Sequence, residues 1–219
     1  MSMLRITHIA VQIPDQPELR LLREIGVLDS MSDVVVSRIA GEQVTRTALA
    51  RILRQPTDLV ILSGHGAPGR IYLSHDSVSA KWLATQLKAG APRLAVMAMC
   101  GSDVGDDKLR AVTTAIAHTG INVIGFPISV DDVVAGAYIV ELVRALVAGA
   151  DIAQAHEVAV EEIGGDDLVA ARGIELRAGL FDGYRPFLDQ MLVFDQRLLR
   201  VEHATMTLLD HFGISADAA

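Results

Sequence analysis

The stretches DLVILSGHG, residues 58–66, and RLAVMAMC, residues 93–100, decide the fold. Each contains a run apolar enough to be buried on both faces, as central parallel strands are. Between them, VSAKWLATQLKAG at 78–90 has the apolar spacing of a helix and ends on glycine. The pattern predicts two strands, 58–64 and 93–100, joined by this helix as neighbours in a parallel sheet.

The same alternation of short β-branched runs and helical periodicity continues on both sides of this unit. We expect further strands at 4–13, 33–39, 70–74 and 121–126, and helices at 17–26, 41–53, 106–120, 131–150 and 151–164. Beyond 165 we expect irregular chain over 166–184 that contains one strand at 173–179, and a final amphipathic helix over 186–212. The fold class is therefore α/β with a mostly parallel sheet, and residues 1–219 contain no linker long enough to define a second domain.

Composition supports a core of aliphatic side chains. The 219 residues are 51% hydrophobic, 21% charged and only 4% aromatic, so Val, Ile, Leu and Ala must form the core. The single cysteine, Cys100, excludes an intrachain disulfide and any multi-thiolate metal site. With no secretion signal and no apolar run of membrane-spanning length, we expect a soluble cytoplasmic protein.

Charge is divided unevenly along the chain. Residues 1–100 carry 11 Lys and Arg against 8 Asp and Glu, whereas residues 101–219 carry 8 against 19, and the total is −8. The acidic half would repel a polyanion such as DNA and attract a cationic peptide. We therefore expect neither a nucleic-acid nor a membrane partner.

Two of the predicted strands end in reactive residues. Because ligands of open α/β sheets bind beyond the carboxyl ends of the strands, adjacent strands would bring His65 and Cys100 to one edge. An imidazole raises the thiolate fraction of a nearby thiol and can then protonate a leaving amine. Glycines on both sides of His65 would allow a sharp turn, and the Gly66 and Cys100 amides could hold an oxyanion.

Simpler interpretations exist for each of these residues. A lone cysteine at the end of an apolar strand is most often a small buried residue, and a GHG sequence can be a tight turn with a solvated histidine. His75 and Asp76 offer His65 too few partners for a metal site, so we expect neither metal nor cofactor. Phosphate-loop, dinucleotide-binding and serine-hydrolase motifs do not occur in the sequence.

The segments DLVILSGHGAPGRIYLS, VSAKWLATQL, PRLAVMAMCGSDVGD and INVIGFPISVDDVVAGAYIVELVRALVAGADIAQAHEVA resemble the CHAT domain, a branch of the caspase-like cysteine peptidases. The resemblance covers about 58–163 and implies a three-layer sandwich with helices on both faces of the sheet. It also implies that His65 is the general base and Cys100 the nucleophile. It further implies a protein or peptide substrate and a regulatory protein partner.

The resemblance extends to GFPISVDDVVAG, where the family places an acidic residue that binds the side chain before the cleaved bond. Asp132 aligns best, with Asp131 beside it, which implies cleavage after Arg or Lys; the alternative is that one of them caps the following helix. Asp103 is a secondary candidate for an acidic wall, although charge at a helix N-terminus is its simpler role. The chain departs from the family at Ile128, where an aromatic residue is usual, and at Ala98, where metacaspases have aspartate.

Three functional hypotheses follow. The first is a cysteine endopeptidase cleaving after basic residues in a bacterial defence or regulated-death system, for which Arg172 and Arg177 would be candidate self-processing sites. The second is a catalytically idle CHAT-like scaffold that serves as a protein-interaction module and has an inert thiol. The third is a generic α/β hydrolytic or small-molecule-binding domain in which the placement of the GHG sequence and the cysteine is coincidental. It predicts that His65 and Cys100 lie far apart.

Overall fold

A computed structural model describes residues 3–12, 25–67, 69–100, 107–126, 130–164, 174–177 and 179. All of them belong to the unit Met1–Leu180. The strands are β1 (Leu4–Ala10), β2 (Val34–Ala40), β3 (Leu59–Ala67), β4 (Arg70–Tyr72), β5 (Ser77–Ser79), β6 (Leu94–Cys100), β7 (Asn122–Gly125) and β8 (Glu175–Arg177). The described helices are α2 (Arg46–Ile52), α3 (Ala80–Gly90), α4 (Asp107–Ala117), α5 (Asp132–Val147) and α6 (Ile152–Ile163), with 3-10 helices η1 (Gly26–Ser30) and η2 (Gly41–Gln43).

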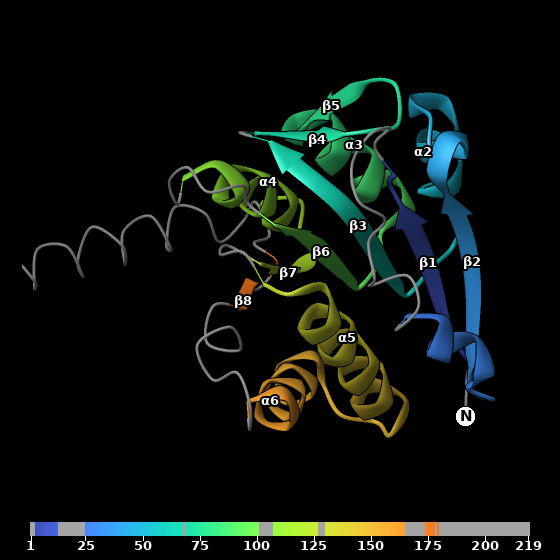
Figure 1. The fold of residues 1–219 in the computed structure, drawn as a ribbon, viewed down its shortest axis with the longest axis vertical. Helices are drawn as coiled ribbons and strands as arrows, with labels where there is room; N and C mark the ends of the chain where they lie inside the picture. The colour runs from blue at the N-terminus through green and yellow to red at the C-terminus, as the bar shows by residue number, and fades with distance from the viewer. Residues whose placement is uncertain are drawn as a thin grey trace, which may run out of the picture. The chain divides into compact units, whose positions relative to one another are not determined.

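The main sheet has the strand order β2-β1-β3-β6-β7-β8 (Figure 1). The five strands from β2 to β7 pair in parallel, and β8 closes the edge antiparallel to β7. β4 and β5 form an antiparallel extension at the end of β3. The predicted neighbours, β3 and β6, are paired in parallel as expected.

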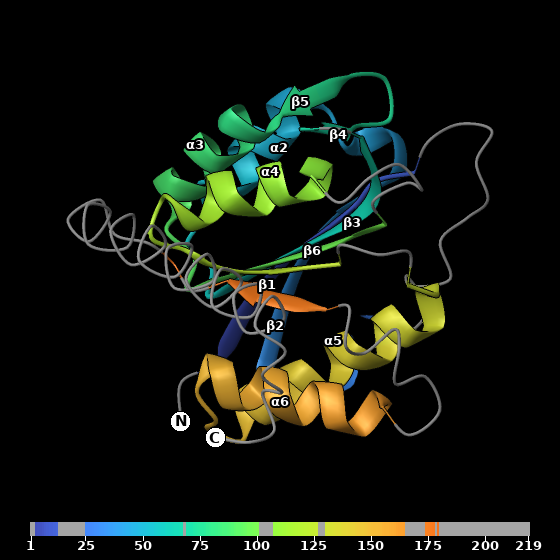
Figure 2. The ribbon, with the colours of Figure 1, turned by 90° about the vertical axis from the view of Figure 1, so that its left-hand side faces the viewer.

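Helices cover both faces of the sheet, as Figure 2 shows with α2, α3 and α4 on one side and α5 and α6 on the other. Val60 and Leu62 of β3 belong to the core under α2, α3 and α4, whereas Leu59 and Ile61 belong to the core under α5 and α6. This alternation explains why the central strands are apolar throughout. Each fully buried side chain of this size contributes about 1.5–3 kcal/mol. The expected three-layer α/β sandwich is confirmed.

Side-chain caps fix where several helices begin. The Ser79 hydroxyl accepts a hydrogen bond from the Trp82 amide at 3.2 Å and starts α3. Asp151 and Gln154 form a reciprocal capping box at the start of α6. Such a cap contributes about 1 kcal/mol. The far end of α3 packs closely on the chain leaving α2, since a Cβ at Gly90 would lie 1.9 Å from the Leu53 carbonyl oxygen.

An aromatic cluster joins α5 and α6 to the end of β7. The Tyr138 ring meets Phe126 edge-on at 5.7 Å between centroids and His156 at 5.9 Å. Burial raises the pKa of Tyr138, so its hydroxyl stays protonated, and it forms a hydrogen bond of 2.6 Å with Nδ1 of His156. Burial also lowers the pKa of His156, which favours the neutral imidazole.

The structure differs from the sequence prediction in three places. The predicted helix at 41–53 is divided into η2 and α2, and the predicted helix at 78–90 begins as strand β5. The strand predicted to end at Gly64 continues through His65 to Ala67, because its last residues pair with β4. The predicted strand at 173–179 exists as β8, whereas the predicted helices at 17–26 and 186–212 fall largely or wholly outside the described residues.

Candidate active site

The carboxyl ends of β3 and β6 bring the two predicted reactive residues together. His65 of β3 is the in-register partner of Cys100, which is the last residue of β6. Paired strands lie about 4.8 Å apart, so the two backbones are immediate neighbours. This backbone proximity contradicts the prediction of the third hypothesis that His65 and Cys100 lie far apart.

His65 has an unusual hydrogen-bonding state. Its side chain is partly buried, and its Nε2 atom is shielded from solvent without a hydrogen-bond partner among the described residues. Buried polar atoms in folded proteins are nearly always paired, because leaving one unpaired costs about 1–3 kcal/mol. A nitrogen of this kind is available to accept or donate a proton.

The backbone before His65 is held by close packing rather than by a turn. A Cβ at Gly64 would lie 2.9 Å from the Cβ of Val11, which follows β1. The Val11 amide also donates to the Ser63 carbonyl over 2.8 Å. The expectation that glycines permit a sharp turn at His65 is wrong, because β3 remains extended and Gly66 pairs with Ile71 of β4. Glycine at position 64 instead permits this close approach.

A series of hydrogen-bonded polar side chains crosses the sheet next to the site. Arg38 donates from Nε to Nδ1 of His8 at 3.0 Å and from a terminal nitrogen to Asp29 at 2.9 Å. Nε2 of His8 lies 3.2 Å from the Ser63 hydroxyl, and His8 and Ser63 are both fully buried. Ser63 stands two residues before His65, so the two share one face of β3.

Within this series of hydrogen-bonded side chains, His8 is neutral. Burial, and then the charge of Arg38, lower its pKa from 6.5 to about 4. Since Nδ1 accepts from Arg38, Nε2 carries the proton and donates to Ser63. The sequence prediction missed this hydrogen-bonded series, although polar residues at 8 and 38 within otherwise apolar strands were a visible signal.

The start of α5 carries the two candidate specificity residues. Asp131 is the N-cap, and its carboxylate accepts a hydrogen bond from the Val133 amide at 2.8 Å. The capping interpretation therefore holds for Asp131. Asp132 is the first helical residue and is partly buried. Because α5 follows β7, the parallel neighbour of β6, both residues lie toward the carboxyl edge of the sheet.

The remaining candidates fall outside the site or outside the described chain. Asp103, Ile128 and Arg172 are outside the described residues. Arg177 ends β8, in register with Val123 of β7. Over the part of the chain that the structure describes, no group of three or more His, Cys, Asp or Glu residues could hold a metal ion.

These features define a three-layer α/β protein with histidine and cysteine side by side at the ends of two central parallel strands. Comparison with family models gives a match to the CHAT domain over residues 15–172. The chain belongs to the CHAT domain family, and with it to the caspase-like cysteine peptidases. The family match is longer than the 58–163 segment that carried the resemblance. No curated protein matches the chain.

The length and apolar character of the described helices also bear on membrane insertion. Among the described helices, none combines the length and the apolar character needed to cross a bilayer.

Proposed function

We propose that this chain is a cysteine endopeptidase in which Cys100 is the nucleophile and His65 the general base. The observation that carries the proposal is the in-register pairing of these two residues on neighbouring parallel strands. The solvent-shielded, unpaired Nε2 of His65 supports it, because this atom has the capacity to take up the thiol proton.

The reaction proceeds in two steps. The Cys100 sulfur attacks the scissile carbonyl carbon while His65 takes the thiol proton, and the backbone amides of Gly66 and Cys100 stabilise the oxyanion. His65 then returns the proton to the amine as the C–N bond breaks, which leaves a thioester on Cys100. Water, deprotonated by His65, adds to the thioester and releases the carboxylate product together with the regenerated thiol.

The proposed substrate is a protein or peptide cleaved after Arg or Lys. Asp132 would bind the basic side chain from the start of α5, beyond the carboxyl edge of the sheet. Its neighbour Asp131 already fills the capping role, so the helix has a cap without Asp132. The acidic second half of the chain would attract cationic segments toward this region.

The family relationship supports the proposal that the chain acts within a regulated system such as bacterial defence or programmed death, with a regulatory protein as its partner. A reducing compartment such as the cytoplasm would keep the lone Cys100 in its thiol form.

The test is hydrolysis of fluorogenic peptides that end in Arg, Lys, Asp or Leu. We expect turnover of the Arg and Lys peptides by the wild type, loss of turnover in Cys100→Ala, and selective loss of Arg and Lys turnover in Asp132→Ala. Asp131→Ala is the matched control, because it removes an equal charge one residue away. Equal turnover by Cys100→Ala would contradict the proposal, and no turnover together with an inert Cys100 would favour the idle scaffold.

A further inference from the structure

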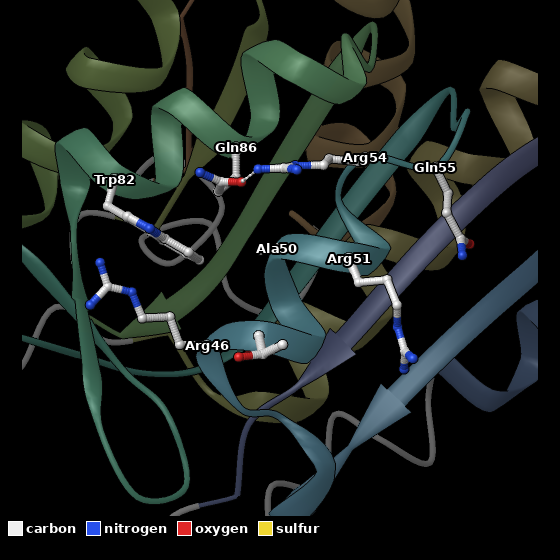
Figure 3. Close-up of a pocket in the computed structure, with 8 residues that line it drawn as sticks. Arg46, Ala50, Arg51, Arg54, Gln55, Trp82 and Gln86 are labelled. Atoms are coloured by element: carbon white, nitrogen blue, oxygen red, sulfur yellow. Dashed lines mark hydrogen bonds between the residues drawn. The ribbon is translucent and has the colours of Figure 1, made fainter.

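A second candidate site lies on the other face of the sheet, between α2 and α3. The two helices and the residues just after α2 line a shallow, open cavity of about 760 Å³. Its lining includes Arg46, Ala50, Arg51, Arg54, Trp82 and Gln86. Figure 3 shows Arg46 and Arg54 reaching from the α2 segment toward Trp82 and Gln86 of α3, with Ala50 between them. We call this cavity the arginine groove.

The arginine groove is basic in a chain whose net charge is −8. Within the described part of the chain, its lining contains three arginines and no acidic residue. All three arginines are exposed, and among the described residues none of them has a carboxylate partner in an ion pair. The positive charge of the groove is therefore not neutralised by these parts of the chain.

Two of the guanidinium groups are held in place by α3. The Arg46 guanidinium lies over the Trp82 ring at 5.1 Å from its centroid, which is a cation–π contact. Arg54 donates to the Oε1 atom of the buried Gln86 at 3.2 Å. Because guanidinium is planar and has five N–H donors, each of these groups keeps donors for an incoming carboxylate. Less side-chain entropy is lost on binding when the cations are already oriented.

The contacts favour a carboxylate-bearing peptide over a nucleic acid. Guanidinium and carboxylate form paired, charge-assisted hydrogen bonds. The face of Trp82 under Arg46 is occupied, so a base could stack there only by displacing the arginine. The acidic remainder of the chain would repel an extended polyanion, whereas a short segment can interact with the groove alone.

We propose that the arginine groove binds an acidic peptide segment of a protein partner, with Arg46 and Arg54 each pairing with a carboxylate. The groove lies on the face covered by α2 and α3, away from the α5 side that carries Asp132. Binding there does not depend on peptide cleavage. Failure of this proposal and failure of the proposed peptidase activity can therefore be distinguished.

Trp82 makes the test specific, because it is the sole tryptophan in the chain. The experiment titrates the full chain carrying Cys100→Ala with an acetylated ten-residue peptide of alternating Glu and Ala, and follows tryptophan fluorescence. A peptide of alternating Gln and Ala and a ten-nucleotide oligothymidylate are the comparison ligands. We expect a saturable fluorescence change with the Glu peptide below about 1 mM, weakened by salt, and no saturation with the other two.

Variants assign the binding to the arginine groove. With a fluorescein-labelled Glu peptide and anisotropy as the readout, Arg46→Gln combined with Arg54→Gln should raise Kd at least tenfold. Lys88→Gln combined with Arg70→Gln removes the same charge from exposed positions outside the groove lining and should change Kd less than twofold. Circular dichroism of each variant establishes that it is folded.

The proposal is overturned by any of three results: no saturable binding of the Glu peptide, an equal loss of affinity in the two double variants, or tighter binding of the oligothymidylate than of the Glu peptide.

Discussion

The two ends of the parallel sheet differ in how their polar side chains are hydrogen-bonded. At the amino end, the Asp58 carboxylate accepts hydrogen bonds from the Arg5 amide at 2.9 Å and from its guanidinium at 3.2 Å. These bonds lower the pKa of Asp58. At the carboxyl end, Nε2 of His65 is shielded from solvent without a partner among the described residues, beside the backbone of Cys100. We infer that the amino end contributes stability, and the proposed function assigns reactivity to the carboxyl end.

The largest expected effect separates these two roles. His65→Leu should reduce kcat/KM by at least about 10³-fold, since it removes the general base. The same change should leave the free energy of unfolding unchanged or slightly higher, because it replaces an unpaired polar group with an apolar one. Asp58→Ala should do the reverse and lower stability while kcat/KM stays within about threefold. Peptide turnover and urea unfolding of both variants check this, and a His65→Leu variant with full turnover would remove the distinction.

Close packing behind the site should give the next largest effect. Gly64→Ala would place a Cβ 2.9 Å from the Cβ of Val11. Overpacking of this kind should lower the free energy of unfolding by about 2–3 kcal/mol. Gly26→Ala is the matched control, because a Cβ there meets nothing within 4 Å. Urea denaturation measures both, and equal stability of the two variants would contradict the role given to Gly64.

The buried His8 should make stability depend on pH. Its folded pKa of about 4 lies below the ordinary value of 6.5, so the unfolded chain takes up the proton first as the pH falls. The stabilisation is complete above pH 6.5 and is lost as the pH falls toward 4. The thermodynamic linkage between protonation and folding predicts that His8 alone accounts for a loss of about 2 kcal/mol in the free energy of unfolding between pH 7 and pH 5.

His8→Gln isolates this contribution, because glutamine does not titrate. Urea unfolding at pH 7 and pH 5 should show a smaller loss for the variant than for the wild type. The loss that remains in the variant includes His156, whose lowered pKa acts in the same direction. Identical losses in the two proteins would show that His8 is not buried in its neutral form.

The smallest expected effect concerns the start of α5. Asp131→Ala removes the carboxylate that accepts from the Val133 amide and should cost about 1 kcal/mol of stability. Asn is also a good N-cap, so Asp131→Asn should restore most of this loss. Thermal unfolding compares the two variants, and an equal loss in both would mean that charge rather than capping is the contribution of Asp131.

Periodicity and strand-end reasoning predicted the parts of this molecule that depend on local sequence. Apolar runs ending at His65 and Cys100 predicted both the parallel pairing of β3 and β6 and the edge at which the two residues meet. The extension of β3 past His65 was not predicted, because it requires pairing with β4. Short edge pairings of this kind leave little trace in hydrophobic periodicity.

Contacts between elements distant in the sequence were beyond such reasoning. The contact between His8 and Arg38 requires that β1 and β2 pair in one particular register, and His8 meets Ser63 only because β1 lies beside β3. The arginine groove likewise exists only because α2 and α3 lie side by side. The division of roles between Asp131 and Asp132 depends on where the helical backbone begins, which sequence patterns locate only to within a few residues.

The most direct test of the central claim is the rate at which iodoacetamide alkylates Cys100 as a function of pH, in the wild type and in His65→Ala. The lone cysteine makes the signal specific. If the two residues form a dyad, the wild type should react with an apparent pKa at least about one unit below the ordinary thiol value of roughly 8.5, and His65→Ala should return it to that value. Superimposable profiles in the two proteins would contradict the dyad.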